Sequence, residues 1–247
     1  MHATEVADRV HRLAHAHVNC YVIDDDDGVT LVDAGLPSMW NLMTDTLRRL
    51  GRGPGDVRAL VLTHGHFDHV GFARRARVEL NVPVLVHPED DHLAAHPYSY
   101  KPQRNRLLYP LLHPRSLPVL GRMAMAGALS VRGIEDTDEL AVGAVLDIPG
   151  RPVPLFAPGH TGGHCILHLP DRDTVISGDA LVTLDPYTGA TGPQIVASAA
   201  TADTATAIES LGPIAETGAA TVLPGHGEPW THGVDAAVGH ARAVGEH

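Results

Sequence analysis

The stretch Thr63-His64-Gly65-His66-Phe67-Asp68-His69 decides how this chain folds and what chemistry it can carry. It directly follows the apolar run at residues 59–62, which predicts a buried strand. His64 and His66 are two residues apart, so at a strand end their side chains project to the same side. Asp68 and His69 come after a turn and could serve a second metal ion. The chain has 18 histidines, so a histidine-rich surface loop is the alternative interpretation. This spacing favours a metal site instead.

Three single residues farther along the chain stand in the same kind of place. His160, Asp179 and His226 each follow an apolar strand pattern and come directly after a glycine. Glycine allows the backbone to turn sharply, so the next side chain can point into a shared cleft. Imidazole and carboxylate groups together suit Zn²⁺, and also Fe or Mn. We therefore expect these three residues to meet the first stretch at a metal centre.

These motifs resemble the signature of the metallo-β-lactamase-fold hydrolases, in which T-H-x-H-x-D-H is followed by a glycine, here Gly71. The resemblance runs from about Asn19 to past His226. It implies the α/β (α+β) class and a four-layer αββα sandwich with metal ions at one edge of the sheets. Four further pieces match in the family's order, at residues 31–35, 158–164, 177–180 and 224–227.

The resemblance also implies two divalent metal ions as cofactors, zinc first, with iron or manganese as alternatives. Three ligands and a bridge on each ion leave an open position, which is typical of catalytic sites. The implied reaction is attack by a metal-bridging hydroxide on a small ester, thioester or lactone, with Asp68 also able to shuttle a proton. Seven residues form the implied set: His64, His66 and His160 on one ion, Asp68, His69 and His226 on the other, and Asp179 as the bridge.

This sequence differs from the motifs of several known enzyme classes in the family, and these differences reduce the number of activities that it could have. Class B β-lactamases usually lack an aspartate at the position of Asp179. Glyoxalase II carries basic residues after that aspartate, whereas residues 180–187 contain none here. Acyl-homoserine lactonases carry a tyrosine where this chain has Val182, and Tyr187 is either a substitute or a packing residue. The alternatives to a dinuclear hydrolase are a mononuclear iron enzyme of the sulfur dioxygenase type and a non-catalytic metal-binding module.

Other polar residues near the motifs have supporting roles in this interpretation. Asp33 is expected to orient a ligand imidazole through its other nitrogen, the alternative being an ordinary turn aspartate. His164 and His87 are expected to pack or to support the site. Cys20 and Cys165 are the only cysteines and lie in apolar contexts, which favours two buried thiols over a disulfide.

Composition limits the partners. The formal net charge is −11, from 29 acidic and 18 basic residues. A field of that sign repels polyanions, so we expect a small-molecule substrate and no nucleic acid. Residues 1–12 lack the apolar core of a signal peptide, and no apolar run approaches the length of a membrane span. The expectation is a cytoplasmic protein without a membrane partner.

The pattern of elements predicts a single domain over residues 1–247, with two sheets and helices outside them. The acidic run at residues 24–27 ends in Gly28 between two apolar runs and predicts a hairpin turn. Helices are expected at residues 36–50, 72–80, 120–129, 201–212 and 233–244. Strands are expected at residues 18–23, 29–32, 59–62, 82–86, 144–148, 153–157, 165–169, 174–177 and 220–223.

Residues 92–134 differ in kind from the rest of the chain. This insert contains no Asp or Glu, and it holds six of the 18 basic residues among many leucines and prolines. It is either a lid or substrate wall, or a cover over the core or a homodimer surface. As a wall it would favour an anionic acyl substrate held by Arg104, Arg106 or Arg115, because arginine pairs bidentately with carboxylates.

Overall fold

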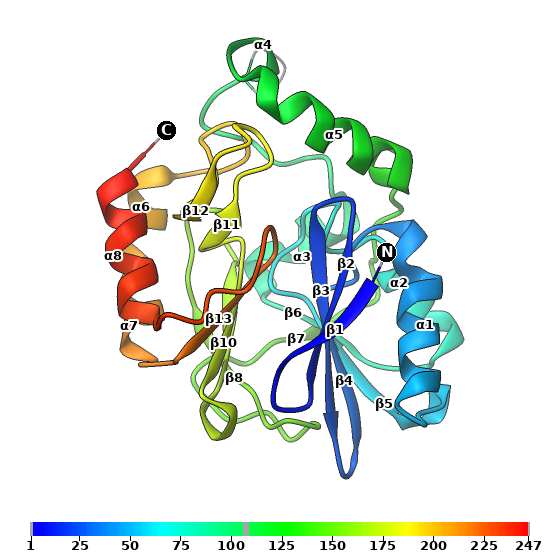
Figure 1. Ribbon diagram of the computed structural model, residues 1–247. Coiled ribbons are helices and arrows are strands. Elements are labelled where there is room, and N and C mark those ends of the chain that lie inside the picture. The colour runs from blue at the N-terminus through cyan, green and yellow to red at the C-terminus, as the bar shows by residue number, and fades with distance from the viewer. Residues whose placement is uncertain (1, 106–108, 247) are drawn as a thin grey trace.

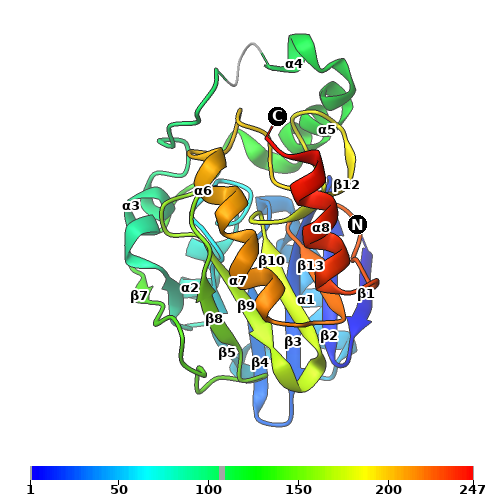
Figure 2. The ribbon, with the colours of Figure 1, turned by 90° about the vertical axis from the view of Figure 1, so that its left-hand side faces the viewer.

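The computed structural model describes residues 2–105 and 109–246. Two sheets face one another, and helices cover the outer face of each (Figures 1 and 2). This arrangement confirms the predicted αββα sandwich. The first sheet has seven strands in the order β1-β2-β3-β4-β5-β6-β7. Their bounds are β1 His2–Ala7, β2 Val10–His15, β3 Val18–Asp25, β4 Gly28–Val32, β5 Val57–Val61, β6 Val84–Val86 and β7 Asp138–Glu139.

The second sheet has four strands in the order β13-β10-β9-β8, and a separate two-stranded ribbon pairs β11 with β12. In the first sheet β4, β5, β6 and β7 run parallel, and in the second β10 and β13 run parallel. The bounds are β8 Val153–Phe156, β9 Cys165–Leu169, β10 Thr174–Gly178, β11 Val182–Leu184, β12 Thr191–Gln194 and β13 Thr221–Pro224.

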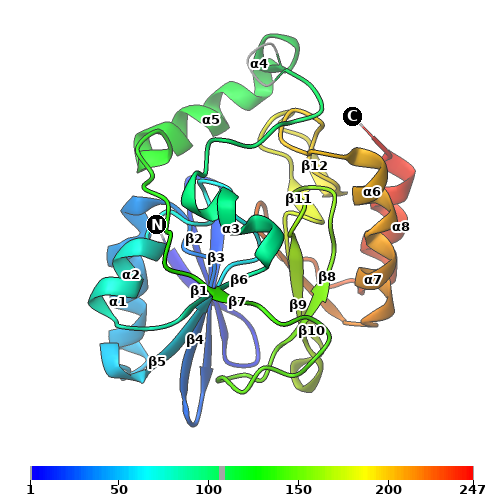
Figure 3. The same ribbon diagram turned by 180° about the vertical axis from the view of Figure 1, so that it is seen from behind.

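The helices form the two outer layers and one end cap. Helices α1 and α2 cover the first sheet, whereas α6, α7 and α8 cover the second (Figure 1). Helices α4 and α5 lie across one end of the sandwich (Figures 1 and 3). The bounds are α1 Trp40–Arg49, α2 Ala73–Glu79, α3 Pro88–Ala95, α4 Tyr109–Leu112, α5 Leu117–Met123, α6 Thr204–Glu209, α7 Leu211–Glu216 and α8 Val234–Val244.

Strand alternation distributes the apolar residues over three cores. Successive side chains of a strand point to opposite faces of the sheet. In β5, Leu60 packs beneath α1 and α2, whereas Val61 lies between the two sheets. In β10, Val175 packs beneath α6, α7 and α8, whereas Ile176 lies between the sheets. Strands buried on both faces explain the nearly continuous apolar runs of the sequence.

Most predicted elements match the structure, but the strand predicted at residues 144–148 was wrong. Leu146 and Ile148 do pack against the core between the sheets, so their burial accounts for the apolar pattern. The backbone N–H of Leu146 donates to the carbonyl of Pro152, but this hydrogen bond is not part of a sheet. Gly150 and Arg151 then turn the chain, with φ of 82° and 45°. The elements β1, β2, β7, α3, α4, β11 and β12 were not predicted.

The insert begins inside α3 and continues through α4 and α5 into a π-helical turn at Ala124–Ala128. Its residues 106–108, including Arg106, lie outside the described part of the chain. Val119 and Met123 join the core beneath α1 and α2, so part of the insert acts as a cover. Its outer surface exposes Leu111, Leu112, Leu117, Met125 and Leu129.

Candidate metal centre

The motif residues meet because parallel strands end at the same edge. His64 follows β5, and Asp33 follows its parallel neighbour β4. Asp179 follows β10, and His226 follows β13, which runs parallel to β10. His160 lies in the turn between β8 and β9. The carboxyl ends of both parallel pairs therefore build one site at the end of the sandwich that α5 crosses (Figure 1).

All seven predicted ligands lie in one buried cluster. Each is at most 5% exposed. Within each of three overlapping groups, the potential ligand atoms lie within 4.8 Å of one another. The groups are His64 with His66 and His160, His64 with His69 and Asp179, and Asp68 with His69 and His226.

Asp179 lies between ligands of both expected ions. Its Oδ2 is 3.5 Å from Nε2 of His160 and 3.2 Å from Nε2 of His226. Its Oδ1 is 3.5 Å from Nε2 of His69. Two ligand atoms, each about 2.05 Å from one tetrahedral zinc ion, are about 3.3 Å apart. The spacing of these atoms therefore fits ligands that share a metal ion.

Hydrogen bonds direct the Nε2 lone pairs of His69 and His226 into the cluster. Nδ1 of His226 lies 2.8 Å from the carbonyl oxygen of His17, which can only accept. Nδ1 of His69 lies 2.9 Å from Oδ2 of Asp33, which confirms the role predicted for this aspartate. Each Nδ1 therefore carries the proton, and each Nε2 keeps the lone pair that a metal needs.

Two threonines assign the same tautomer to His64 and His160. Thr201 donates its hydroxyl proton to the carbonyl of Val196 over 2.7 Å, so its oxygen accepts from Nδ1 of His160 at 3.2 Å. The Thr63 hydroxyl donates to Asp33 over 2.9 Å and accepts from Nδ1 of His64 at 3.0 Å. His66 is the exception, because its Nδ1 faces Nε2 of His160 at 3.0 Å.

Several atoms of the cluster have no hydrogen-bond partner among the described residues. These buried atoms are Nε2 of His64, His66 and His69 and Oδ1 of Asp179. A buried polar atom without a hydrogen bond destabilises a fold by about 1–3 kcal/mol. His64, His69 and Asp179 form one of the three groups above, so these open atoms fit a bound divalent metal ion.

Burial sets the protonation of the imidazoles. It lowers the pKa of His160 to about 4 and holds the pKa values of His64 and His66 well below the usual range. These side chains are neutral at pH 7, as metal ligands must be. At His226 burial is opposed by the carboxylates of Asp179 and Asp68, which raise its pKa to about 10. A metal ion must displace that proton.

The loop around Asp179 is packed too closely for larger residues. Gly178 has a φ of +50°, and a Cβ there would lie 2.8 Å from Oγ1 of Thr63. A Cβ on Gly225 would lie 2.2 Å from Oδ1 of Asp179. Nε2 of His164 accepts the backbone N–H of Asp179 over 3.0 Å, which confirms that His164 supports the site.

Asp90 is a residue that the sequence did not single out. It is 1% exposed in α3, and its Oδ2 accepts from the amide of Gly65 and the hydroxyl of Thr161, both at 2.8 Å. Its Oδ1 accepts from the amide of Gly163 over 2.8 Å. Asp90 thus joins the loop of His64 and His66 to the loop of His160. The only feature of the sequence that could have pointed to Asp90 is its position in the first turn of a helix that begins at Pro88.

Part of the insert borders the metal centre, as predicted. A small cavity of ≈ 10 Å³ is lined by ligands together with Tyr100, Met123 and Tyr187. A cavity of ≈ 360 Å³ is lined by His66 and His160 and, from the insert, by Tyr100 and Lys101 among others. The hydroxyls of Tyr100 and Tyr187 lie 3.1 Å apart. Tyr187 therefore lies at the site, although it comes from the loop after β11.

Two of the three arginines expected to clamp a substrate line neither cavity. Arg104 and Arg115 are exposed and absent from both walls. Arg106 falls outside the described residues, so the structure does not place it. A substrate-binding role for Arg104 and Arg115 therefore stays a prediction, which neither cavity supports. Lys101 is the basic side chain that the insert brings to the larger cavity.

Comparisons with known proteins agree with this geometry. The profile of the Metallo-beta-lactamase superfamily matches residues 15–226. The Probable metallo-hydrolase YflN of Bacillus subtilis (strain 168) is 29% identical over 240 residues, covering 92% of this chain and 87% of its own.

Two similar solved structures are of metal-binding proteins. TTHA1623, solved in a di-iron-bound form, is 26% identical with a TM-score of 0.61, covering 91% of this chain and 95% of its own. LRA-12, a class B3 di-zinc metallo-beta-lactamase from an Alaskan soil metagenome, is 16% identical with a TM-score of 0.65. That match covers 92% of this chain and 78% of LRA-12, and it concerns the fold alone. Within the described residues, no helix combines the length and apolar character needed to cross a membrane.

Proposed function

Because the chain belongs to the metallo-β-lactamase superfamily, we propose that it is a hydrolase of small esters, thioesters or lactones that works with two divalent metal ions. The observation that carries this proposal is the position of Asp179, whose two oxygens lie 3.2–3.5 Å from Nε2 of His69, His160 and His226. One carboxylate facing ligands of both sets suits a bridge between two ions. Zinc is the proposed metal, with iron or manganese as alternatives.

The bound ions would supply an acidified water and polarise the carbonyl under attack. The chain's own residues hold the geometry for that chemistry. Asp33, Thr63, Thr201 and the carbonyl of His17 fix the imidazole orientations, so the ligand atoms need no rearrangement. The insert residues Tyr100 and Met123 close over the cluster and restrict bulk water.

Asp68 is the residue proposed to move the proton. Its Oδ2 lies 3.3 Å from Nε2 of His226, and it also lines the small cavity. Among the described residues, no hydroxyl or backbone amide donates a hydrogen bond to this carboxylate, so it is not committed to holding a loop as Asp90 is. A carboxylate in that place can take a proton from the attacking water and pass it to the leaving group.

No side-chain nucleophile is needed for this reaction. Cys165 is a buried thiol whose Sγ faces the carbonyl of Gly163 at 3.6 Å. Burial raises its pKa to about 12, so the thiolate that would attack a carbonyl is not formed near neutral pH. Cys20 is also buried and free, and its pKa is raised well above the usual range by burial.

Metal content and turnover, measured on the same preparation, test the proposal. Elemental analysis of protein purified without added metal should find close to two ions per chain. A panel of esters, thioesters and lactones should then show turnover that a chelator abolishes and Zn²⁺, Mn²⁺ or Fe²⁺ restores. A single iron with oxygen consumption on a persulfide would replace the hydrolase with a redox enzyme. Two bound metals without turnover across the panel would instead indicate a non-catalytic module.

A further inference from the structure

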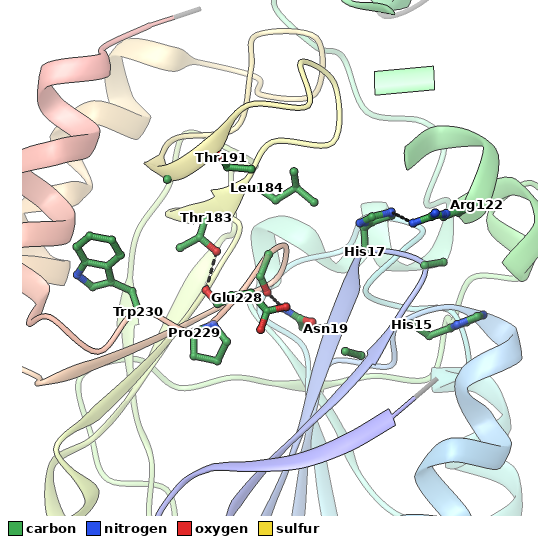
Figure 4. A pocket seen from close by; sticks show the side chains of 14 residues that line it. His15, His17, Asn19, Arg122, Thr183, Leu184, Thr191, Glu228, Pro229 and Trp230 are labelled. Carbon is green, nitrogen blue, oxygen red and sulfur yellow. Dashed lines mark hydrogen bonds between the residues drawn. The ribbon is translucent and has the colours of Figure 1, made fainter. Parts of the chain in front are cut away.

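A third cavity, larger than the two at the metal centre, lies against the segment that follows His226. Its volume is ≈ 550 Å³, within the range of small-molecule pockets. The turn between β2 and β3, helix α5, the β11–β12 ribbon and the segment after His226 form its walls. Figure 4 shows Arg122 and His17 on one side and Trp230 on the other. None of the seven metal ligands lines it.

One end of this cavity carries an uncompensated positive charge. Nη1 of Arg122 donates to Nε2 of His17 over 3.1 Å (Figure 4). In the described parts of the chain, no carboxylate lies within ion-pair distance of Arg122. Glu228 also lines the cavity, but its carboxylate pairs with Arg12 at 2.7 Å and not with Arg122. The guanidinium of Arg122 keeps further donors for an anion, because an arginine offers five.

The opposite end of the cavity is apolar. Leu184, Pro229 and Trp230 line it, and all three are half-buried. The indole Nε1 of Trp230 already donates to the carbonyl of Gly233 over 3.0 Å, so the ring offers the pocket an apolar surface. A ligand that fits both ends has a carboxylate at one end and a hydrocarbon body.

We propose that this cavity binds an amphipathic organic carboxylate, with its charged group on Arg122 and its apolar body against Leu184, Pro229 and Trp230. The cavity adjoins the metal centre, because the His17 carbonyl holds His226 and Met123, next to Arg122, lines the small metal cavity. The carboxylate belongs either to the hydrolysed molecule or to a separate effector. Only the former rests on the proposed function. Arg122 is thus the insert arginine that meets a ligand, in place of Arg104 or Arg115.

Direct binding of octanoate to the metal-loaded protein tests the proposal without turnover. The chain has two tryptophans, and Trp40, the first residue of α1, is 6% exposed. In a Trp40→Phe variant, fluorescence reports Trp230 alone, and calorimetry on the wild-type chain is used if that variant is unstable. Octanoate should give a saturable change, and octanol of the same chain length should bind at least several-fold more weakly.

Matched arginine variants locate the charged end. Arg122→Gln should weaken octanoate about tenfold or more, as expected for a lost charged hydrogen bond. It should leave octanol binding unchanged. Arg115→Gln removes the same charge from an exposed insert position outside the cavity and should change neither. Equal affinities for octanoate and octanol, or equal effects of the two variants, would overturn the proposal.

Inhibition kinetics separate the two sources of the ligand. Octanoate competing with an acyl substrate would place the substrate's own carboxylate in the cavity. A change in kcat without competition would identify a separate effector site. If the chain proves not to be a hydrolase, the binding measurements still stand. A lack of saturable octanoate binding would reject the cavity proposal even in an active enzyme.

Discussion

The carboxylate of Asp90 accepts the backbone N–H of Gly65, the residue between His64 and His66, over 2.8 Å. The same side chain holds Thr161 and Gly163, on the loop that carries His160. Three ligands from two distant parts of the chain are thereby set relative to one another by one carboxylate. Burial raises the pKa of Asp90, although these three hydrogen bonds favour its anion.

Asp90→Asn should weaken both the fold and the metal centre. Both carboxylate oxygens accept from backbone N–H groups, so the amide NH₂ of asparagine would face a donor. Such a buried mismatch destabilises by about 1–3 kcal/mol. Thermal unfolding of the metal-free protein should show a Tm lower by roughly 2–10 °C, with lower metal occupancy. Asp91→Asn, at the exposed neighbouring position, should change the Tm little, and equal losses in both variants would contradict the role of Asp90.

Asp179→Ala should lose at least one metal ion and nearly all activity. The substitution removes the only carboxylate that faces His69, His160 and His226 together among the described residues. Elemental analysis and the acyl-substrate panel are the measurements. Asp171→Ala removes an exposed carboxylate from a turn and should keep both metal and turnover. Retention of two ions by Asp179→Ala would refute the bridging assignment.

Asp33→Asn should lower metal affinity or activity by about 10–100-fold. Asp33 accepts from Nδ1 of His69 and from both the amide and the hydroxyl of Thr63, and an amide can satisfy only part of this set. Competition with a chelator of known affinity measures the change. Asp27→Asn, exposed in the hairpin turn, serves as the matched variant. An unchanged affinity would mean that packing alone fixes His69.

Cys165→Ala should leave kcat and KM intact and reduce stability by about 1 kcal/mol. A pKa of about 12 means that the thiol stays protonated throughout the working range of pH. In the folded protein at pH 8, iodoacetamide should therefore modify neither Cys165 nor Cys20, whereas both should react after unfolding. Mass spectrometry counts the adducts. Loss of turnover at unchanged metal content would call the metal-dependent mechanism into question.

The clustering of the seven residues could be predicted because they follow apolar strands and share local signatures. A glycine before His160, Asp179 and His226 turns each strand end toward the same edge. Asp33 and His164 were predicted as supports of the site, whereas the His17 carbonyl and Asp90 could not be predicted in the same way. The His17 carbonyl has no side-chain signature, and Asp90 reaches its partners only when α3 packs against two loops. Such contacts depend on tertiary placement, which periodicity does not contain.

Some strands of the fold could likewise be predicted from the sequence, and others could not. Strands with apolar residues on both faces were recognised because burial imposes a continuous pattern, as in β5 and β10. β1 is the edge strand of the first sheet and β2 is its neighbour. Both carry polar residues, including the buried Arg12, which pairs with Glu228. At residues 144–148 the error is the reverse, because a strand was predicted where the structure has none. Leu146 and Ile148 are partly buried without joining a ladder, and an apolar pattern reports burial alone.

The ligand set joins segments as far apart in the sequence as His64 and His226, in a chain whose two cysteines are free. Ions held there would act as a reversible cross-link, closing long loops as a disulfide does but without an oxidant. A cross-link of this kind responds to mass action. Above the dissociation constant of a site, each tenfold rise in free metal adds about 1.4 kcal/mol to the free energy of unfolding. The metal supply around the protein would then set how long the folded chain survives.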